Sequence, residues 1–258
     1  MILHYTGIFC IGIIIGFLGG LFGKGGSAIA TPMLHLMGVP GFIAVASPLP
    51  ATVPGTLIAS VEYRKLGLID WQVVSWSIYA GIPAAVAGSY LTLYTGSVPL
   101  LVLTGLLVLF FGLSFIFFPD TEKNDEDEAM EATKDQRPSY RLFRLIIVAL
   151  FAGFVSGMLA NSGGFLLAPA YARILKLPIK KAFACSLAVS IFLALPGTVV
   201  HAYLGHVDWL VTLILAAGSV PSSFYGAKVA IKARSNRLEF GYGIVLLGLG
   251  VLFLINLL

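Results

Sequence analysis

A lysine lies inside a glycine cluster in the first apolar stretch of the chain, GFLGGLFGKGGSAIATP, at residues 16–32. Lys24 is followed by Gly25, Gly26 and Ser27, and a helix is expected to begin near Ser27. Glycine permits a sharp turn and lets a ligand approach the backbone closely. The first N–H groups of a helix have no partner within the helix, and its N-terminus carries partial positive charge. This arrangement favours the binding of an anion.

A second cluster, GFVSGMLANSGGFLLAP at residues 153–169, matches the first at an offset of 137. It places Asn161, Ser162, Gly163 and Gly164 where the first cluster has its lysine and the residues after it. Two half-helix N-termini, one from each half of a membrane protein, form the midplane anion sites of some secondary transporters. We therefore expect the two glycine turns to meet near the membrane midplane.

Two other interpretations of these clusters stay open. Glycines let helices pack closely in membranes, and a lysine can extend its amine along an apolar surface to the interface. Against them, the turn occurs twice, and no carboxylate near Lys24 is available to pair with it. Because an unpaired cation inside a membrane is costly, we interpret Lys24 as a charge that serves an anionic ligand.

Two serines are further candidates for the site. Ser47 in VASPLP and Ser186 in ACSLAV lie at matching places in the first long apolar span of each half. If these spans pack beside the glycine turns, each hydroxyl can donate to an anion oxygen. A hydrogen bond from the serine to a carbonyl of its own helix is an equally good interpretation.

The remaining polar residues indicate which chemistry is absent. Outside the acidic linker the acidic residues lie near span ends, and Asp70 and Asp208, each before a tryptophan, are expected helix N-caps. A membrane protease, a carboxylate-based proton pump and a cation transporter therefore lack their essential groups. Cys10 and Cys185 have no metal-ligand spacing, so neither a disulfide nor a metal or cofactor is expected.

All four histidines are expected on the outer side of the membrane. A proton-uptake role competes there with an ordinary interfacial one. They are His4, His35, His201 and His206.

The composition identifies the environment of the chain. Of its 258 residues, 58% are hydrophobic and 11% are charged, against about 25% charged residues in soluble domains. Apolar runs of about 20 residues recur, long enough to cross a bilayer as helices. This is the composition of a polytopic membrane protein, and the net charge of +4 reflects cytoplasmic loops rather than nucleic-acid binding.

One polar segment, residues 119–140, divides the chain into two similar halves, 1–118 and 141–258. The stretch from 119 to 141 holds eight of the twelve acidic residues, which is typical of a solvated linker. Besides the glycine clusters, GLIDW at 67–71 matches GHVDW at 205–209, and GIPAAVAG at 81–88 matches GSVPSSFYG at 218–226. We interpret the halves as repeats.

Loop charges predict that the repeats are inverted. Outside residues 120–144 there are eleven lysines and arginines, and ten lie in EYRKLGLID, RILKLPIKK and KVAIKARSNR. Corresponding loops of the two halves have opposite basic character, and all three basic loops become cytoplasmic only if each half crosses the membrane an odd number of times. Both termini are then external and the linker is cytoplasmic.

The predicted fold is an all-α polytopic membrane protein with two inverted-topology repeats. Each repeat contains a glycine-rich broken or re-entrant helical hairpin followed by three transmembrane helices. The long spans are expected at 43–62, 71–93, 98–118, 181–203, 209–228 and 238–258.

The blocks resemble the TauE/SafE family of sulfite and organosulfonate exporters, also called the toluene sulfonate uptake permease family. The resemblance rests on FGKGGSAIATP, NSGGFLLAP, GLIDW, GHVDW and GIPAAVAG, and it covers nearly the whole chain apart from the linker. It implies a transporter of small sulfur-containing or carboxylated anions. The family more often has a small residue where Lys24 lies, and the second half has Asn161 and Ser162, so the substrate stays open.

We therefore expect a secondary transporter in the cell membrane that exports a small oxyanion, sulfite or an organosulfonate first, by alternating access around the midplane site. Lys24 would supply charge, the turns backbone N–H groups, and four side chains directional hydrogen bonds: Ser47, Asn161, Ser162 and Ser186. An anion channel, a transporter of thiosulfate or a carboxylate, and a membrane-embedded sulfur-handling enzyme are the alternatives. The expected partners are the anion and the lipid bilayer, and a homo-oligomer is left open.

Overall fold

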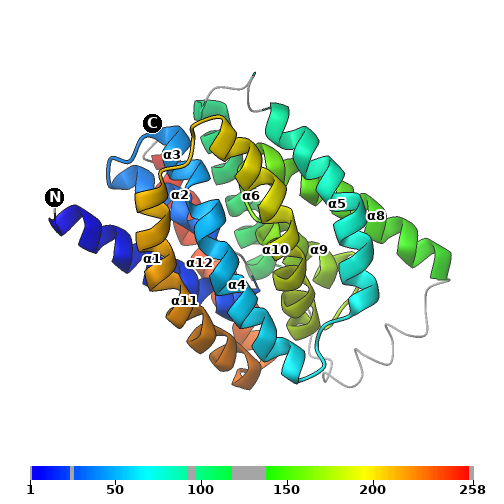
Figure 1. The fold of residues 1–258 in the computed structure, drawn as a ribbon. Helices are drawn as coiled ribbons and strands as arrows, with labels where there is room; N and C mark the ends of the chain where they lie inside the picture. The colour runs from blue at the N-terminus through cyan, green and yellow to red at the C-terminus, as the bar shows by residue number, and fades with distance from the viewer. Residues whose placement is uncertain (1, 24–25, 92–93, 95–96, 118–137, 256–258) are drawn as a thin grey trace.

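A computed structural model describes residues 2–23, 26–91, 94, 97–117 and 138–255, which form helices joined by short turns (Figure 1). The first half contains α1 (Ile2–Phe22), α2 (Ser27–Leu36), α3 (Gly41–Ala46), α4 (Pro48–Lys65), α5 (Trp71–Leu91) and α6 (Ser97–Phe117). The second half contains α8 (Pro138–Met158), α9 (Gly164–Arg173), α10 (Ile179–Tyr203), α11 (Trp209–Lys232) and α12 (Ser235–Ile255). Residues 138–140 of the expected linker begin α8, and 119–137 lie outside the described residues.

The helices confirm the predicted all-α membrane fold. Among the described residues, five stretches are long and apolar enough to cross a membrane: His4–Phe22, Gly41–Lys65, Arg141–Met158, Ile179–Tyr203 and Trp209–Lys232. Helices α5, α6 and α12 have 21 residues each, about 31 Å at 1.5 Å per residue. The six expected long spans coincide with α3 plus α4, α5, α6, α10, α11 and α12. The chain is a multi-pass membrane protein.

The distribution of side chains suits a lipid environment. Large apolar side chains such as Phe151, Val199 and Leu213 lie exposed on the outer surface of the bundle. Small polar side chains are buried inside it, mostly serines and threonines. Among residues whose exposure is described, no lysine, arginine, aspartate or glutamate is buried. Because lipid offers no hydrogen bonds, polar groups within the membrane must find partners inside the protein.

The two halves repeat the same series of turns. Every described residue with positive φ has a counterpart in the other half at an offset of 137 or 138. The pairs are Gly23 with Ala160, Gly26 with Gly163, Gly38 with Lys176, and Gly67 with Gly205. Asp70 and Asp208 also match, because each carboxylate accepts hydrogen bonds from the first-turn N–H groups of the helix that follows it. The expected N-caps are confirmed.

Glycines hold each first helix against a helix of the other half. Helix α1 packs along α11, and α8 packs along α5. A Cβ added at Gly20 would collide with the carbonyl of Ser223, and one at Gly157 with the carbonyl of Ala85. Such close approach of backbones is the usual way helices associate in membranes. Gly20 and Gly157 therefore serve close helix packing, as one of the two interpretations of the glycine clusters expects.

Two hydrogen bonds fix the directions of the central helices, α4 and α10, which pack together. The Asp208 N–H donates to Ser47 Oγ over 2.9 Å, so α11 starts beside the start of α4. The Asp70 N–H donates to Cys185 Sγ over 3.3 Å, so α5 starts near the start of α10. Because α5 follows the end of α4, the helices α4 and α10 run in opposite directions (Figure 1).

The helix directions place the described lysine and arginine side chains at one end of the bundle, which we call the basic end. It contains the ends of α4, α9 and α11 and the starts of α8, α10 and α12. The described basic residues all lie there: Arg64, Lys65, Arg141, Arg144, Arg173, Lys176, Lys180, Lys181, Lys228, Lys232, Arg234 and Arg237. The opposite end, which we call the histidine end, contains His4, His35, His201 and His206.

The glycine packing predicts a specific loss of stability. Gly226→Ala is expected to lower the free energy of unfolding by about 1–3 kcal/mol, the usual cost of overpacking, because the new Cβ meets the Phe17 carbonyl of α1. Gly248→Ala is the matched control, since a Cβ at Gly248 has no neighbour within 4 Å. Thermal unfolding of both variants in detergent checks the prediction, and equal midpoints would contradict it.

Candidate functional site

Each half begins with a broken hairpin, in which a long helix is followed by a turn and a ten-residue helix. The long helices end at left-handed residues, Gly23 with φ 68° and Ala160 with φ 45°. The short helices α2 and α9 start after left-handed Gly26 and Gly163, with φ 70° and 76°. Ten residues of helix span about 15 Å, half of a hydrocarbon core of about 30 Å.

The two turns contact each other. Ser27 Oγ donates to Asn161 Oδ1 over 2.9 Å and accepts from the Ser162 N–H over 3.2 Å. The Ser162 hydroxyl lies 3.4 Å from the same Ser27 oxygen. All three residues are buried, with at most 4% of their surface exposed. The structure thus brings together the N-termini of α2 and α9, as the paired clusters suggest.

Asn161 has an amide nitrogen without a partner. Its Oδ1 accepts from Ser27 Oγ and from the Gly163 N–H, the latter over 3.3 Å. Since a backbone N–H requires an acceptor, this contact fixes which end of the amide faces Gly163. The Nδ2 group is buried and makes no hydrogen bond to any residue that the structure describes. An unsatisfied buried donor is costly, so a ligand that accepts its protons would stabilise this arrangement.

The short helices also lack side-chain caps. The N-cap residues Gly26 and Gly163 have no side chain that can accept from the first-turn N–H groups of α2 and α9. Gly164 is the first residue of α9, so its backbone is part of this N-terminus. Lys24 and Gly25, between the described Gly23 and Gly26, lie outside the described residues.

Ser186 lies against the first turn. Its hydroxyl donates to the carbonyl oxygen of Gly23 and also contacts the carbonyl of Phe183 in its own helix, at 3.0 Å. The predicted proximity of Ser186 to a glycine turn is therefore present, but its hydroxyl is already engaged with backbone carbonyls. It supports the turn rather than pointing a free donor at a ligand.

Ser47 occupies a different place from Ser186. Its Oγ accepts from the Asp208 N–H at the histidine end, and its carbonyl accepts from Thr212 Oγ1 over 3.0 Å. The equivalent contact in the other half is made by Cys185 with the Asp70 N–H. Ser47 therefore corresponds to Cys185, one residue before Ser186, and the matching of the two serines is corrected. An alignment of VAS with FAC at an offset of 138 carries this signal.

The sequence did not predict two residues that support the second turn. Ala160 adopts the left-handed conformation that Gly23 has in the first half, although an alanine gives no sequence signal for it. Ser156 closes the second turn, because its hydroxyl donates to the carbonyl of Asn161. The only sequence signal for this role is the position of Ser156 one helical turn before the block ANSGG at residues 160–164.

The described acidic groups lie away from the paired turns. Glu62 pairs with Lys65, and Asp70 lies 3.5 Å from Arg141, both at the basic end. Asp208 caps α11 at the histidine end. The described donors at the paired turns therefore have no carboxylate among their hydrogen-bond partners, and the electrostatics there favour a negative ligand.

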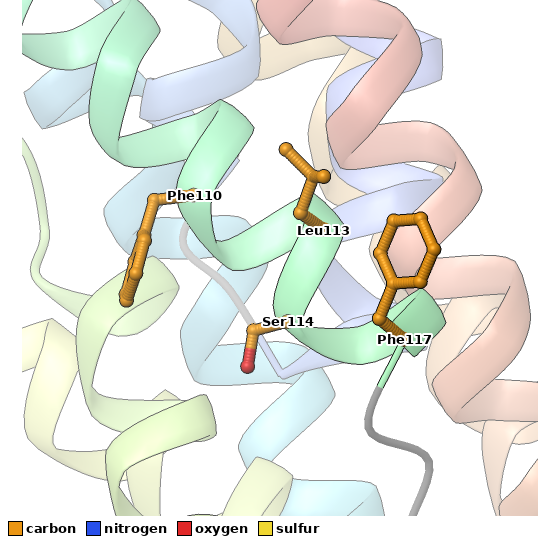
Figure 2. Close-up of a pocket in the computed structure, with 4 residues that line it drawn as sticks. All are labelled: Phe110, Leu113, Ser114 and Phe117. Atoms are coloured by element: carbon orange, nitrogen blue, oxygen red, sulfur yellow. The ribbon is translucent and has the colours of Figure 1, made fainter.

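An open groove on α6 has a different character. Its volume is about 510 Å³, and it is lined by Phe110, Leu113, Ser114 and Phe117. Figure 2 shows these side chains along one helix. The lining is almost entirely apolar, so it offers nothing to an anion.

Membrane-spanning helices, two broken hairpins and buried facing helix N-termini are features of secondary transporters. The family model for the sulfite exporter TauE/SafE matches residues 8–253 of this chain. The chain belongs to this family, and the resemblance seen in the sequence is confirmed. Membership of a transporter family implies a protein that is not an enzyme.

Curated relatives cover nearly the whole chain. A probable membrane transporter protein, YunE of Bacillus subtilis, is 26% identical over 93% of this chain and 93% of its own length. A probable membrane transporter protein of Haemophilus influenzae is 28% identical over 87% and 84%. MJ0441 of Methanocaldococcus jannaschii, also a probable membrane transporter protein, is 26% identical over 95% and 93%. No solved structure matches. The protein is a membrane transporter.

The contact between the turns predicts a stability effect of Ser27. Ser27→Ala is expected to lower the free energy of unfolding by about 1–3 kcal/mol, because it leaves the buried Ser162 N–H without its acceptor and removes one of the two donors to Asn161 Oδ1. Ser75→Ala is the control, since that exposed hydroxyl only contacts the Gln72 carbonyl. Chemical denaturation in detergent compares the two, and equal stabilities would show that the turns do not depend on this contact.

Proposed function

We propose that this protein is a secondary transporter of small oxyanions, with sulfite or an organosulfonate as the first candidate. The observation that carries the proposal is the buried amide nitrogen of Asn161, which has no partner among the described residues and lies between two facing helix N-termini. Helix N-termini bind anions through their free N–H groups and positive dipole ends. The family description names sulfite, which fits this chemistry.

The chemistry of the ligand follows from the donors. Sulfite and sulfonate groups present three oxygens that accept hydrogen bonds, and the turns offer Asn161 Nδ2 and the first N–H groups of α2 and α9. Lys24, next to Gly23 in the sequence, supplies the compensating positive charge. The proposed site contains Lys24, Gly25, Gly26 and Ser27 from the first half, and Asn161, Ser162, Gly163 and Gly164 from the second. Ser186 supports the first turn through the Gly23 carbonyl.

The proposed mechanism is alternating access between inverted repeats in the cell membrane. The antiparallel directions of α4 and α10 and the gathering of basic residues at one end support it. By the positive-inside rule the basic end is cytoplasmic. Helix α1 then starts, and α12 ends, at the outer side. Each hairpin is held by a helix of the opposite half, so rocking of one half against the other opens the site to either side.

The burial of the site favours a carrier over an anion channel. Ser27 and Ser162 are each 1% exposed, whereas a conducting pore keeps its polar lining in contact with water. A membrane potential that is negative inside favours export of an anion that moves alone, by about 2.3 kcal/mol per charge per 100 mV. Thiosulfate and carboxylates share the same acceptor chemistry, so the ligand screen below includes them.

The site assignment is tested by ligand-induced stabilisation of the purified protein. Sulfite, thiosulfate, methanesulfonate and acetate are compared by thermal shift at constant ionic strength. Asn161→Asp keeps the acceptor oxygen that Ser27 and Gly163 use, removes the donor and adds a negative charge. It and Lys24→Met are each expected to weaken anion binding by at least about tenfold, since hydrogen bonds to charged groups contribute about 1.5–3 kcal/mol.

Ser47→Ala is the matched control, because its hydroxyl contacts Asp208 at the histidine end. It is expected to bind the anion like the wild type. If Asn161→Asp and Lys24→Met bind the anion with wild-type affinity, the site assignment is refuted. If proteoliposomes with the wild-type protein show no saturable counterflow, the carrier mechanism is refuted.

The inverted orientation predicts the accessibility of matched loops. Leu66 directly follows the end of α4, and Tyr203 is the last residue of α10; both side chains are exposed. Cysteines at these positions, in a background with Cys10 and Cys185 replaced by serine, are expected to react with an impermeant maleimide from opposite sides. Ser47 already serves in the place of Cys185, so that replacement should be tolerated. Labelling of both cysteines from the same side would overturn the orientation.

A further inference from the structure

Two histidines contact each other at the histidine end, beside the second hairpin. His201, near the end of α10, is 2% exposed, and its Nδ1 lies 3.2 Å from Nδ1 of His206. The other ring nitrogen of His201, Nε2, lies 3.5 Å from the carbonyl oxygen of Gly157 in α8. Gly157 precedes Asn161 by four residues, so this pair adjoins the hairpin that carries the candidate site.

The contacts determine where the protons lie. A carbonyl oxygen only accepts, so His201 Nε2 carries the proton in its contact with Gly157. Nδ1 of the neutral His201 ring is then an acceptor, and His206 Nδ1 must donate to it. This leaves His206 Nε2 as the nitrogen that can take up a further proton. His206 is partly exposed, whereas His201 is enclosed.

The first half makes the same contact without a titrating ring. Tyr63, equivalent to His201 at an offset of 138, donates its hydroxyl to the Gly20 carbonyl over 3.1 Å. Gly20 is equivalent to Gly157, and the residue equivalent to His206 is Leu68. Holding the hairpin helix therefore does not require histidine. The two imidazoles are an addition made only in the second half.

We propose that His201 and His206 form a proton-binding site that couples proton uptake from the outer side to anion transport, an inference that rests on the proposed function. A proton binds to His206 Nε2, and the proton on His206 Nδ1 moves to His201 Nδ1. The charge then resides on the enclosed His201 imidazolium, which keeps its Nε2–H on the Gly157 carbonyl. One proton enters and none is lost.

The surroundings of the pair support this role. The Phe42 ring of α3 stacks on His206, with centroids 4.5 Å apart and an interplanar angle of 11°, and an aromatic face attracts a cation. Burial lowers the pKa of His206, so this ring is neutral at neutral pH when no anion is bound. By linkage, a cation beside the site raises affinity for an anion, and a bound anion raises affinity for the proton equally.

No carboxylate among the described residues pairs with either ring. Asp208, two residues after His206, directs Oδ1 to the N–H groups of Leu210 and Val211. The described parts of α3 and of the first half of α4 contribute no titratable group, nor do the last two turns of α8. Helix α5 contributes Tyr90, and α10 itself Tyr203, both exposed. The other described titratable groups on α10 and on the helices that contact it, among them Tyr171, Arg173 and Tyr242, lie at the basic end or near Phe183.

The proton site is tested first without substrate. Histidine resonances of ¹⁵N-labelled protein in nanodiscs are followed from pH 8 to pH 4 and assigned by single His→Gln replacements. The proposal expects one proton to be shared by His201 and His206, with the titration of His201 lost in His206→Gln. Two rings that both remain neutral down to pH 4, or that titrate independently of each other, would overturn it.

Coupling is tested by flux in proteoliposomes with the membrane potential clamped. Methanesulfonate is the probe, because a sulfonate keeps one charge throughout this pH range. In the wild type, an acid-outside gradient of one pH unit should drive uptake, with accumulation of up to about tenfold for one proton per anion, since one unit is a tenfold difference in proton activity. His201→Tyr reproduces the Tyr63 arrangement, so it should retain counterflow and lose this accumulation.

Tyr63→Phe is the matched control, because it removes the equivalent contact in the first half and leaves the histidines intact. It is expected to keep the response to the pH gradient. A full response in His201→Tyr would overturn the coupling. Absence of counterflow with methanesulfonate and sulfite in the wild type would instead refute the proposed function, while the histidine titration would still decide whether the pair binds a proton.

Discussion

The rest of the structure depends on the meeting of two helix N-termini inside the membrane. Each terminus carries about half a positive charge, so α2 and α9 repel each other unless negative charge lies between them. The Asn161 oxygen supplies part of it, because it accepts from Ser27 of one half and Gly163 of the other. This partial charge is small beside that of an anion. The space between the two N-termini therefore has a positive electrostatic potential that favours a negative ligand.

Close helix packing is what holds these termini together. Backbone contacts at glycines pair α1 with α11 and α8 with α5, so each hairpin is attached to the half it does not belong to. The bonds from Ser186 to the Gly23 carbonyl and from Ser156 to the Asn161 carbonyl then fix the turns. The N-termini of α2 and α9 therefore meet where the two halves contact each other, which is where the proposed rocking motion would act.

The spans and the glycine turns were predictable because they depend on hydropathy and on glycine, which adopts positive φ more readily than other residues. The sequence pattern does not distinguish glycines that allow close helix packing from glycines that form the turn. Gly16 and Gly20 serve packing, whereas Gly23 and Gly26 form the turn. The left-handed Ala160 was hidden because contacts of the folded protein, not its own preference, stabilise that conformation. The sequence paired Ser47 with Ser186 instead of Cys185, an error of one residue. It arose because the Ser47 hydroxyl and the Cys185 thiol accept equivalent N–H groups, those of Asp208 and Asp70.

The differences between the halves are as informative as their likeness. The turns recur in both halves, yet equivalent positions differ in charge or titration, among them Lys24 and Asn161, Tyr63 and His201, and Leu68 and His206. A carrier with two identical halves would offer the same chemistry to both sides of the membrane. Since helix geometry alone supplies the anion-binding N–H groups in both halves, side chains are free to diverge. In the proposed transporter the fixed charge belongs to the first hairpin and the proton-dependent charge lies beside the second, so the two halves respond to different conditions.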